Sequence, residues 1–233
     1  MRCIVVTTAA AILLGSQAWA SGGGSVGGGG FGSTSGSEEP RQTSPDQVAK
    51  SSYNRGVKEI GKAKAADTDA AVATDPGKKQ KLVDKAQKGF TKARDYFLAA
   101  VNARSDMYQA WNYIGYTQRK LGNYDAALAA YDQALTYNPA YGEAIEYRGE
   151  AYLALNRIDD AKSAYMILFR DARPLAAELM SAMQKWIESR KLDARGLSPD
   201  DLDAFGKWLG ERAAISEKAA LLGAGKSSAS SWN

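Results

Sequence analysis

The sequence predicts an all-α fold in which helical hairpins stack side by side as a solenoid. Gly115 recurs as Gly149, 34 residues later, and other small and aromatic residues recur at the same interval. Apolar residues between them follow helical spacing, and Gly122-Asn123 and Asn138-Pro139 divide the pattern as helix ends do. A repeat of this length is typical of a solenoid, because one hairpin cannot bury its own apolar face and must stack on a neighbour.

The N-terminal residues 1–20 are predicted to be a signal peptide. Arg2 precedes an apolar run from Ile4 to Leu14, and Ala18-Trp19-Ala20 fits a cleavage site. The apolar run is too short to span a membrane. We therefore expect export to a bacterial periplasm, with secretion as the alternative. Residues 21–46 are rich in Gly and Ser and are expected to form a disordered linker.

The composition excludes several kinds of catalytic and metal site. The chain has no His, and its one cysteine, Cys3, lies within the predicted signal peptide. The processed chain would then lack a thiol nucleophile, a disulfide, an imidazole base and thiolate or imidazole metal ligands. The acidic residues occur at helix starts and on solvated faces, so the sequence predicts no enzyme, no cofactor and no metal site.

Residues 47–107 are predicted to form an elongated first hairpin. Ala93 and Phe97 precede Ala127 and Tyr131 by 34 residues, so they belong to a second helix of the repeat. Gly56 is the expected counterpart of Gly115, but 25 additional residues separate it from the second helix. We expect two long helices, Asp46–Val72 and Lys78–Ala103, with a turn at Asp75-Pro76-Gly77.

The unit 108–141 carries the most regular pattern. Trp111, Ile114 and Gly115 are followed by Ala127, Tyr131 and Ala134, and then by Pro139. This Trp-x-x-Ile-Gly, Ala-x-x-x-Tyr-x-x-Ala, Pro arrangement resembles the tetratricopeptide-repeat (TPR) family. The resemblance implies a right-handed α-solenoid of about three hairpins. Small residues would stand where two helices approach closely, and larger ones there would force the helices apart.

The unit 142–173 is a second repeat with two departures. Arg148 stands where the family usually has an aliphatic residue, and Pro174 comes one position late. Residues 174–222 are predicted to form helices that cap the open end of the solenoid, the last of them starting at Ser198-Pro199. Residues 223–233 are predicted to be a flexible tail.

The family resemblance implies a concave groove lined by the first helix of each repeat. The residues that would face this groove are Gln109, Asn112, Tyr116, Arg119, Lys120, Glu143, Glu146 and Glu150. Some family members bind a peptide's terminal carboxylate at matching positions, but Glu146 and Glu150 would repel such a ligand. A basic or mixed-charge partner is favoured, unless these glutamates are solvated or pair with Arg119.

A second candidate surface is the elongated hairpin. Residues 49–104 contain 13 Lys and Arg against 6 Asp and Glu, whereas residues 105–172 contain 6 against 9. Six lysines are concentrated on its second helix: Lys78, Lys79, Lys81, Lys85, Lys88 and Lys92. These lysines are either an ordinary solvated face or a contact with an acidic protein, anionic lipid or cell-wall polymer.

Two functions therefore remain open from the sequence. One is a non-catalytic protein–protein interaction scaffold of the bacterial envelope, which binds a protein or peptide in its groove. The other is a structural envelope-binding protein that uses the basic hairpin. Nucleic acid is not an expected partner, because no aromatic and basic residues are interleaved. No transmembrane segment is expected in the processed chain.

Overall fold

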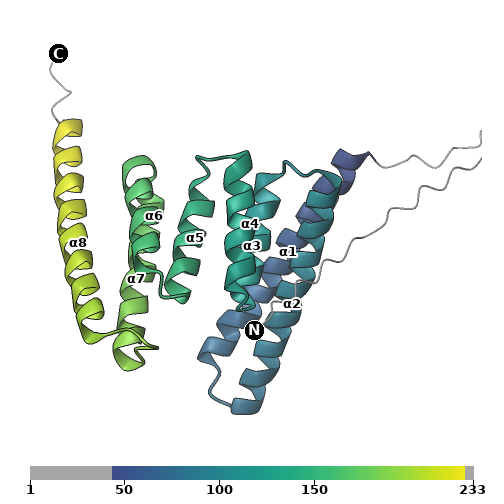
Figure 1. The fold of residues 1–233 in the computed structure, drawn as a ribbon. Coiled ribbons are helices and arrows are strands. Elements are labelled where there is room, and N and C mark those ends of the chain that lie inside the picture. The colour runs from purple at the N-terminus through teal and green to yellow at the C-terminus, as the bar shows by residue number, and fades with distance from the viewer. Residues whose placement is uncertain (1–43, 229–233) are drawn as a thin grey trace, which may run out of the picture. The chain divides into compact units, whose positions relative to one another are not determined.

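The computed structural model describes residues 44–228, which fold into helices without any strand in this range. They are α1 (Pro45–Val72), α2 (Pro76–Ala103), α3 (Tyr108–Lys120), α4 (Tyr124–Tyr137), α5 (Gly142–Ala154), α6 (Ile158–Asp171), α7 (Arg173–Leu192) and α8 (Pro199–Ser228). Successive helices pack against one another in antiparallel hairpins (Figure 1). The all-α solenoid predicted from the 34-residue interval is confirmed.

The first hairpin begins with a well-defined helix cap. The Ser44 hydroxyl accepts a hydrogen bond from the Gln47 backbone N–H, and the Gln47 side chain accepts one from the Ser44 N–H. Helix α1 therefore begins at Pro45, one residue before the predicted start and inside the predicted linker. The predicted signal peptide and residues 21–43 of the linker lie outside the described residues.

The turn of this hairpin also serves as a helix cap. The Asp75 carboxylate accepts a hydrogen bond from the Lys78 backbone N–H at 2.6 Å, and Pro76 occupies the first turn of α2. The start of α2 is thus two residues earlier than predicted, because Asp75-Pro76 starts the helix as well as ending the turn. Both helices of this hairpin have 28 residues, and the hairpin extends past α3 and α4 (Figure 1).

Small residues allow the two long helices to approach closely. Buried alanines line α1 at Ala63, Ala66 and Ala70, and they face Ala86 and Gly89 of α2. A Cβ added at Gly89 would lie 2.8 Å from the Cβ of Ala63. The distal part of the hairpin therefore packs mainly through its own small residues.

The repeat 108–141 packs as its pattern predicts. Gly115 of α3 faces the ring of Tyr131 of α4, and an added Cβ would lie 2.6 Å from Tyr131 Cδ1. Tyr131, Ala127 and Ala134 are fully buried. In the next repeat Gly149 performs the same role, but its close neighbours are Leu179 of α7 and Ala164 of α6.

The odd-numbered helices form the inner layer of the solenoid. Helix α3 packs against α5, and α5 packs against α7, whereas α4 and α6 make at most a weak contact. The stack therefore curves with α3, α5 and α7 on its inner side. On the outer side a cleft of about 700 Å³ lies between Leu135 of α4 and Ile167 of α6.

Helices α7 and α8 complete the core at the C-terminal end. Phe205 and Leu209 of α8 are buried against α6 and α7, with the Trp186 and Phe205 rings 5.7 Å apart. The Ser198 hydroxyl accepts from the Asp201 N–H at the start of α8. Helix α8 continues to Ser228, so the predicted tail from residue 223 begins too early. Within residues 44–228, no helix combines the length and apolarity that a membrane span requires.

Candidate functional site

The predicted groove residues of α3 follow one face of that helix but differ in exposure. Gln109 is half-buried at the first turn. Asn112 and Tyr116 are buried, at 2% and 8% exposure, because α2 and α5 pack against α3. Lys120 lies at the helix end, where its Nζ is 2.5 Å from Asp67 Oδ2 of α1. Gln109 and Lys120 are thus more exposed to solvent than Asn112 and Tyr116, which lie between them on the inner face.

Arg119 connects the inner helices α3 and α5. Its guanidinium forms an ion pair with Glu150 of α5, and it lies over the rings of Tyr116 and Tyr147, 5.6 and 5.4 Å from their centroids. Burial lowers the pKa of Arg119, whereas the nearby Glu150 carboxylate raises it. The pKa is raised overall. The structure thus contains a pair between Arg119 and Glu150, which is one of the alternatives left open by the sequence.

Glu146 is a buried carboxyl group one helical turn before Glu150. It is 2% exposed, and its pKa is raised to about 9 by burial and then by its hydrogen bond and repulsion with Glu150. Arg119 opposes this shift, and Glu178 of α7 adds to it. The raised pKa favours the protonated form of Glu146 at neutral pH, and Arg119 forms its ion pair with Glu150.

Several polar atoms beneath the inner face lack protein partners. The Asn112 side-chain carbonyl and Arg119 Nε are buried without a hydrogen bond in the described part of the chain. Such groups are costly in a folded protein unless a ligand or water satisfies them. Asn112 is consequently a candidate contact for a hydrogen-bond donor that reaches into this face.

Glu143 is exposed at the first turn of α5, four residues before Tyr147. Residues four apart share a helix face, so Glu143 stands beside Tyr147 on α5 as Gln109 stands beside Tyr113 on α3. Glu143 also borders the outer cleft, since it lies near the edge where α5 meets α4. Its carboxylate raises the pKa of the neighbouring Tyr141, although burial is the larger cause.

A cluster of half-buried tyrosines on the inner face was not singled out from the sequence. We call it the tyrosine patch, and its members are Tyr53, Tyr108, Tyr113, Tyr141 and Tyr147. Tyr53 of α1 lies 5.8 Å from Tyr113 of α3, and Tyr108 lies 4.9 Å from Tyr141. Tyr113 and Tyr147 are 34 residues apart, so the repeat interval itself could have revealed this pair.

The hydroxyls of the tyrosine patch lie near one another. Burial raises the pKa of Tyr53 to about 12, and the hydroxyls of Tyr113 and Tyr108 add to this shift. Burial also raises the pKa of Tyr147, followed by Glu146, Tyr116 and Tyr113. Neutral hydroxyls that share one surface supply hydrogen-bond donors and acceptors beside apolar rings.

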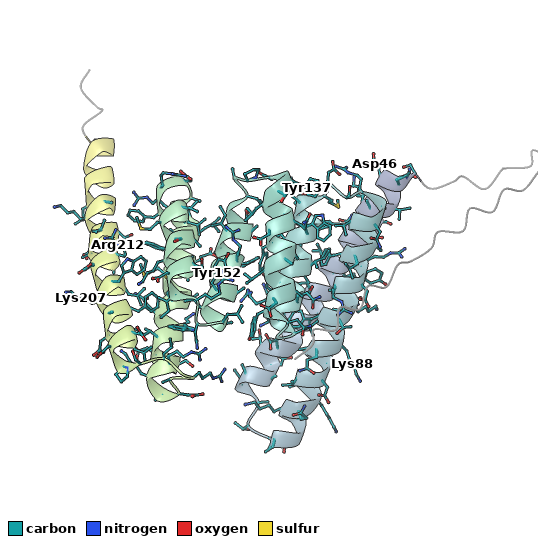
Figure 2. All side chains as sticks on the ribbon, in the orientation of Figure 1. Asp46, Lys88, Tyr137, Tyr152, Lys207 and Arg212 are labelled. Carbon is teal, nitrogen blue, oxygen red and sulfur yellow. The ribbon has the colours of Figure 1, made fainter. Side chains whose placement is uncertain are left out.

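The basic hairpin presents its six lysines to solvent. Lys78, Lys81, Lys85, Lys88 and Lys92 follow alternate spacings of three and four residues along α2, which places them on one face, whereas Lys79 lies off this row. Figure 2 shows Lys88 projecting from the outer side of the hairpin. Lys92 is partly engaged, with its Nζ 3.4 Å from Glu59 of α1.

We find no group of three or more His, Cys, Asp or Glu side chains suited to a metal ion in residues 44–228. The outer cleft is lined mainly by apolar side chains, with Arg148 and Arg170 at its border. Arg148 pairs with Asp132 at 2.7 Å, and Arg170 pairs with Asp171 at 2.7 Å, so both cations are occupied.

Comparison with known proteins identifies one repeat. Residues 108–141, which form α3 and α4, match the family model of the tetratricopeptide repeat. Among solved structures, the first TPR of Spaghetti (RPAP3) bound to the HSP90 peptide SRMEEVD is similar at 17% sequence identity and a TM-score of 0.46. The alignment covers 61% of this chain and 96% of that chain. Assignment of the repeat therefore rests on the family match and on the helix packing described above.

Proposed function

We propose that this protein is a non-catalytic scaffold that binds a protein partner on the inner face of its helical solenoid. The match of residues 108–141 to the tetratricopeptide repeat supports this class of function, because stacked helical repeats create extended binding surfaces. The inner face is formed by α3, α5 and α7, with α1 joined to it through the Tyr53–Tyr113 contact.

The observation that carries this proposal is the tyrosine patch. Its rings are anchored at the edge of the core, but they retain partial exposure on three helices, α1, α3 and α5. Tyr is enriched at protein interfaces, since it offers a large contact area and a hydroxyl while losing little conformational entropy. The patch therefore combines the features of an energetically important contact region.

The charges of the inner face favour a basic or mixed-charge partner. A peptide carboxylate would approach the exposed Glu143 and would be repelled by it. Glu150 is already paired with Arg119, which leaves little free positive charge in this part of the surface to attract an anion. A cationic group near Glu143 would instead gain from its exposed carboxylate.

A double substitution on the inner face tests whether the partner binds there and not elsewhere on the molecule. Gln109→Arg combined with Glu143→Arg alters equivalent, accessible positions in two successive repeats. We expect the unmodified chain to retain a defined protein from the producing cell's envelope extract, and this variant to lose it. Lys81→Gln with Lys85→Gln is the matched control and should retain the same protein. Equal retention by all three chains would contradict the proposal.

The cell envelope is the proposed location, on the basis of the predicted signal peptide in residues 1–20. Fractionation of the producing cells, with N-terminal sequencing of the protein recovered, tests this directly. Export predicts a mature chain that begins at Ser21 and is absent from the cytosol. A cytosolic chain that retains Met1 would contradict the location without affecting the binding surface.

The basic hairpin supports a second candidate function. Five of its lysines form one row on α2, and only Lys92 of this row pairs with α1 among the ion pairs of residues 44–228. This row could attach the protein to anionic lipid, cell-wall polymer or an acidic protein. Replacement of Lys78, Lys81, Lys85 and Lys88 by Glu should then abolish salt-sensitive binding to anionic vesicles or sacculi. If this variant and the unmodified chain co-sedimented equally with anionic vesicles and sacculi, and bound acidic proteins equally, the second candidate function would be excluded.

A further inference from the structure

The tyrosine patch has unused hydrogen-bonding capacity. None of its five hydroxyls makes a hydrogen bond to another side chain or to the backbone among residues 44–228. The Tyr131 hydroxyl, by contrast, is fully buried beneath the face and lies out of reach of solvent. The patch hydroxyls are therefore the ones that a ligand at the inner face would meet first.

The rings of the patch are held in place before any ligand arrives. Tyr113 stacks on Phe97 of α2 with centroids 5.0 Å apart and an angle of 11° between the planes. Tyr53 meets the same Phe97 edge-on at 5.6 Å, and Tyr147 contacts Tyr116 at 5.4 Å. Because Phe97 and Tyr116 are buried, the exposed rings have little freedom to lose on binding.

The geometry argues against two common modes of peptide binding. A strand cannot be added here, since residues 44–228 contain no strand edge to extend. An amphipathic helix needs a continuous apolar groove, whereas polar Gln109 and Glu143 flank the tyrosines on α3 and α5. A left-handed polyproline II segment has the complementary properties. Its carbonyls have no internal hydrogen bonds, and its proline rings pack on aromatic side chains.

We propose that the tyrosine patch binds a proline-rich segment of a partner protein in the polyproline II conformation, with a flanking Lys or Arg directed to Glu143. This inference rests on the proposed scaffold function and names the class of partner segment. The tyrosine hydroxyls donate to the segment's carbonyls, and their rings pack against its prolines. Glu143 supplies the exposed negative charge that orients the segment.

Titration with synthetic peptides tests this ligand class on the full chain. The probes are Ac-RAPPLPPLP-amide, the same peptide with Glu in place of Arg, and an analogue with every Pro replaced by Ala. Isothermal titration calorimetry should show saturable binding of the first peptide. Binding of the Glu analogue should be at least about fivefold weaker, and the Ala analogue should not bind. Equal binding of all three would overturn the proposal.

Conservative substitutions locate the binding. Tyr113→Phe with Tyr147→Phe keeps both rings, and hence their packing, while removing the two hydroxyls. We expect about tenfold weaker binding of the arginine peptide to this variant. Glu143→Gln should remove the preference for Arg over Glu in the peptide. Tyr137→Phe is the control, since Tyr137 is 43% exposed on α4 and lies outside the patch.

The outcomes separate this inference from the scaffold function. If no proline-rich peptide binds, but Gln109→Arg with Glu143→Arg still abolishes retention of an envelope protein, then the ligand class is wrong and the scaffold function stands. If the peptides bind equally to the double Tyr→Phe variant and the unmodified chain, then the patch is not their site. Failure of both the retention and the titration experiments would reject the inner face altogether.

Discussion

Arg119 of α3 and Glu150 of α5 form an ion pair that joins two neighbouring repeats across the inner face. Their side chains are 15% and 25% exposed, and the Arg119 guanidinium lies 5.6 and 5.4 Å from the ring centroids of Tyr116 and Tyr147. The pair thus does two things at once. It fixes the spacing of α3 and α5, and it neutralises the charge beside the tyrosine patch.

Loss of Arg119 is expected to destabilise the stack. Arg119→Met removes the partner of Glu150 and leaves a carboxylate in a poorly solvated position, so the free energy of unfolding should fall by about 3 kcal/mol. The double variant Arg119→Met, Glu150→Gln should recover part of this loss, because no unpaired charge then remains. Denaturant unfolding of the unmodified chain, the two single variants Arg119→Met and Glu150→Gln, and the double variant measures the coupling. Additive effects of the two substitutions would show that the pair does not stabilise the fold.

The buried Glu146 predicts an unusual dependence of stability on pH. Its pKa rises from 4.5 in the unfolded chain to about 9 in the folded chain, with Glu150, Arg119 and Glu178 as the charged neighbours. Between these values the folded state binds more protons than the unfolded state, so stability falls as pH rises. The slope approaches about 1.4 kcal/mol per pH unit.

Glu146→Gln should flatten this dependence between pH 5 and pH 9, since the amide cannot lose a proton. The variant should also be more stable than the unmodified chain at pH 8. Glu217→Gln on the exposed surface of α8 is the control and should leave the profile unchanged. The measurement is thermal or denaturant unfolding at several pH values. Parallel profiles for the unmodified chain and Glu146→Gln would contradict burial of an ionisable Glu146.

The close approach of α3 and α4 makes Gly115 sensitive to substitution. In Gly115→Ala the new Cβ would lie 2.6 Å from Tyr131 Cδ1, and Tyr131 is fully buried and cannot move aside. We expect a loss of about 1–3 kcal/mol in the free energy of unfolding. Gly61→Ala is the matched control, because nothing lies within 4 Å of its added Cβ. That variant should gain about 0.5–1 kcal/mol from helix propensity.

Arg148 offers a test of how far the second repeat departs from the first. It occupies the position that Ile114 holds in the repeat 108–141, and its Nε is buried without a partner. Arg148→Leu should raise the free energy of unfolding by about 1 kcal/mol, since it removes this unsatisfied donor. Asp132→Asn removes only the 58% exposed partner and should change stability by less than about 1 kcal/mol. A destabilised Arg148→Leu variant would show that the ion pair outweighs the unsatisfied donor.

The fold could be predicted because the repeat interval constrains it strongly. Gly115, Ala127 and Tyr131 recur at fixed spacing, and only stacked hairpins place such small and large residues in complementary contact. The positions of the helix ends were predicted less accurately. Asp75 and Ser44 act as caps for helices that the sequence placed one or two residues later, and α8 extends past Leu222.

The candidate site was predictable only in part. The sequence selects the face of α3 that includes Asn112 and Tyr116, but it does not show that neighbouring helices bury both. The pKa of Glu146 likewise depends on residues of α3 and α7, which are distant along the chain. The correspondence of Gly56 with Gly115 places Tyr53 at the position of Asn112, so the repeat pattern does not single out the contact of Tyr53 with Tyr113.

Site-specific photocrosslinking in the producing cell tests the central claim most directly. A photoreactive p-benzoylphenylalanine is placed at position 109, on the inner face, or at position 88, on the outer side of the hairpin. We predict a covalent adduct with a defined partner protein from position 109 and none from position 88. Adducts from position 88 alone would contradict binding at the inner face and assign the working surface to the basic hairpin.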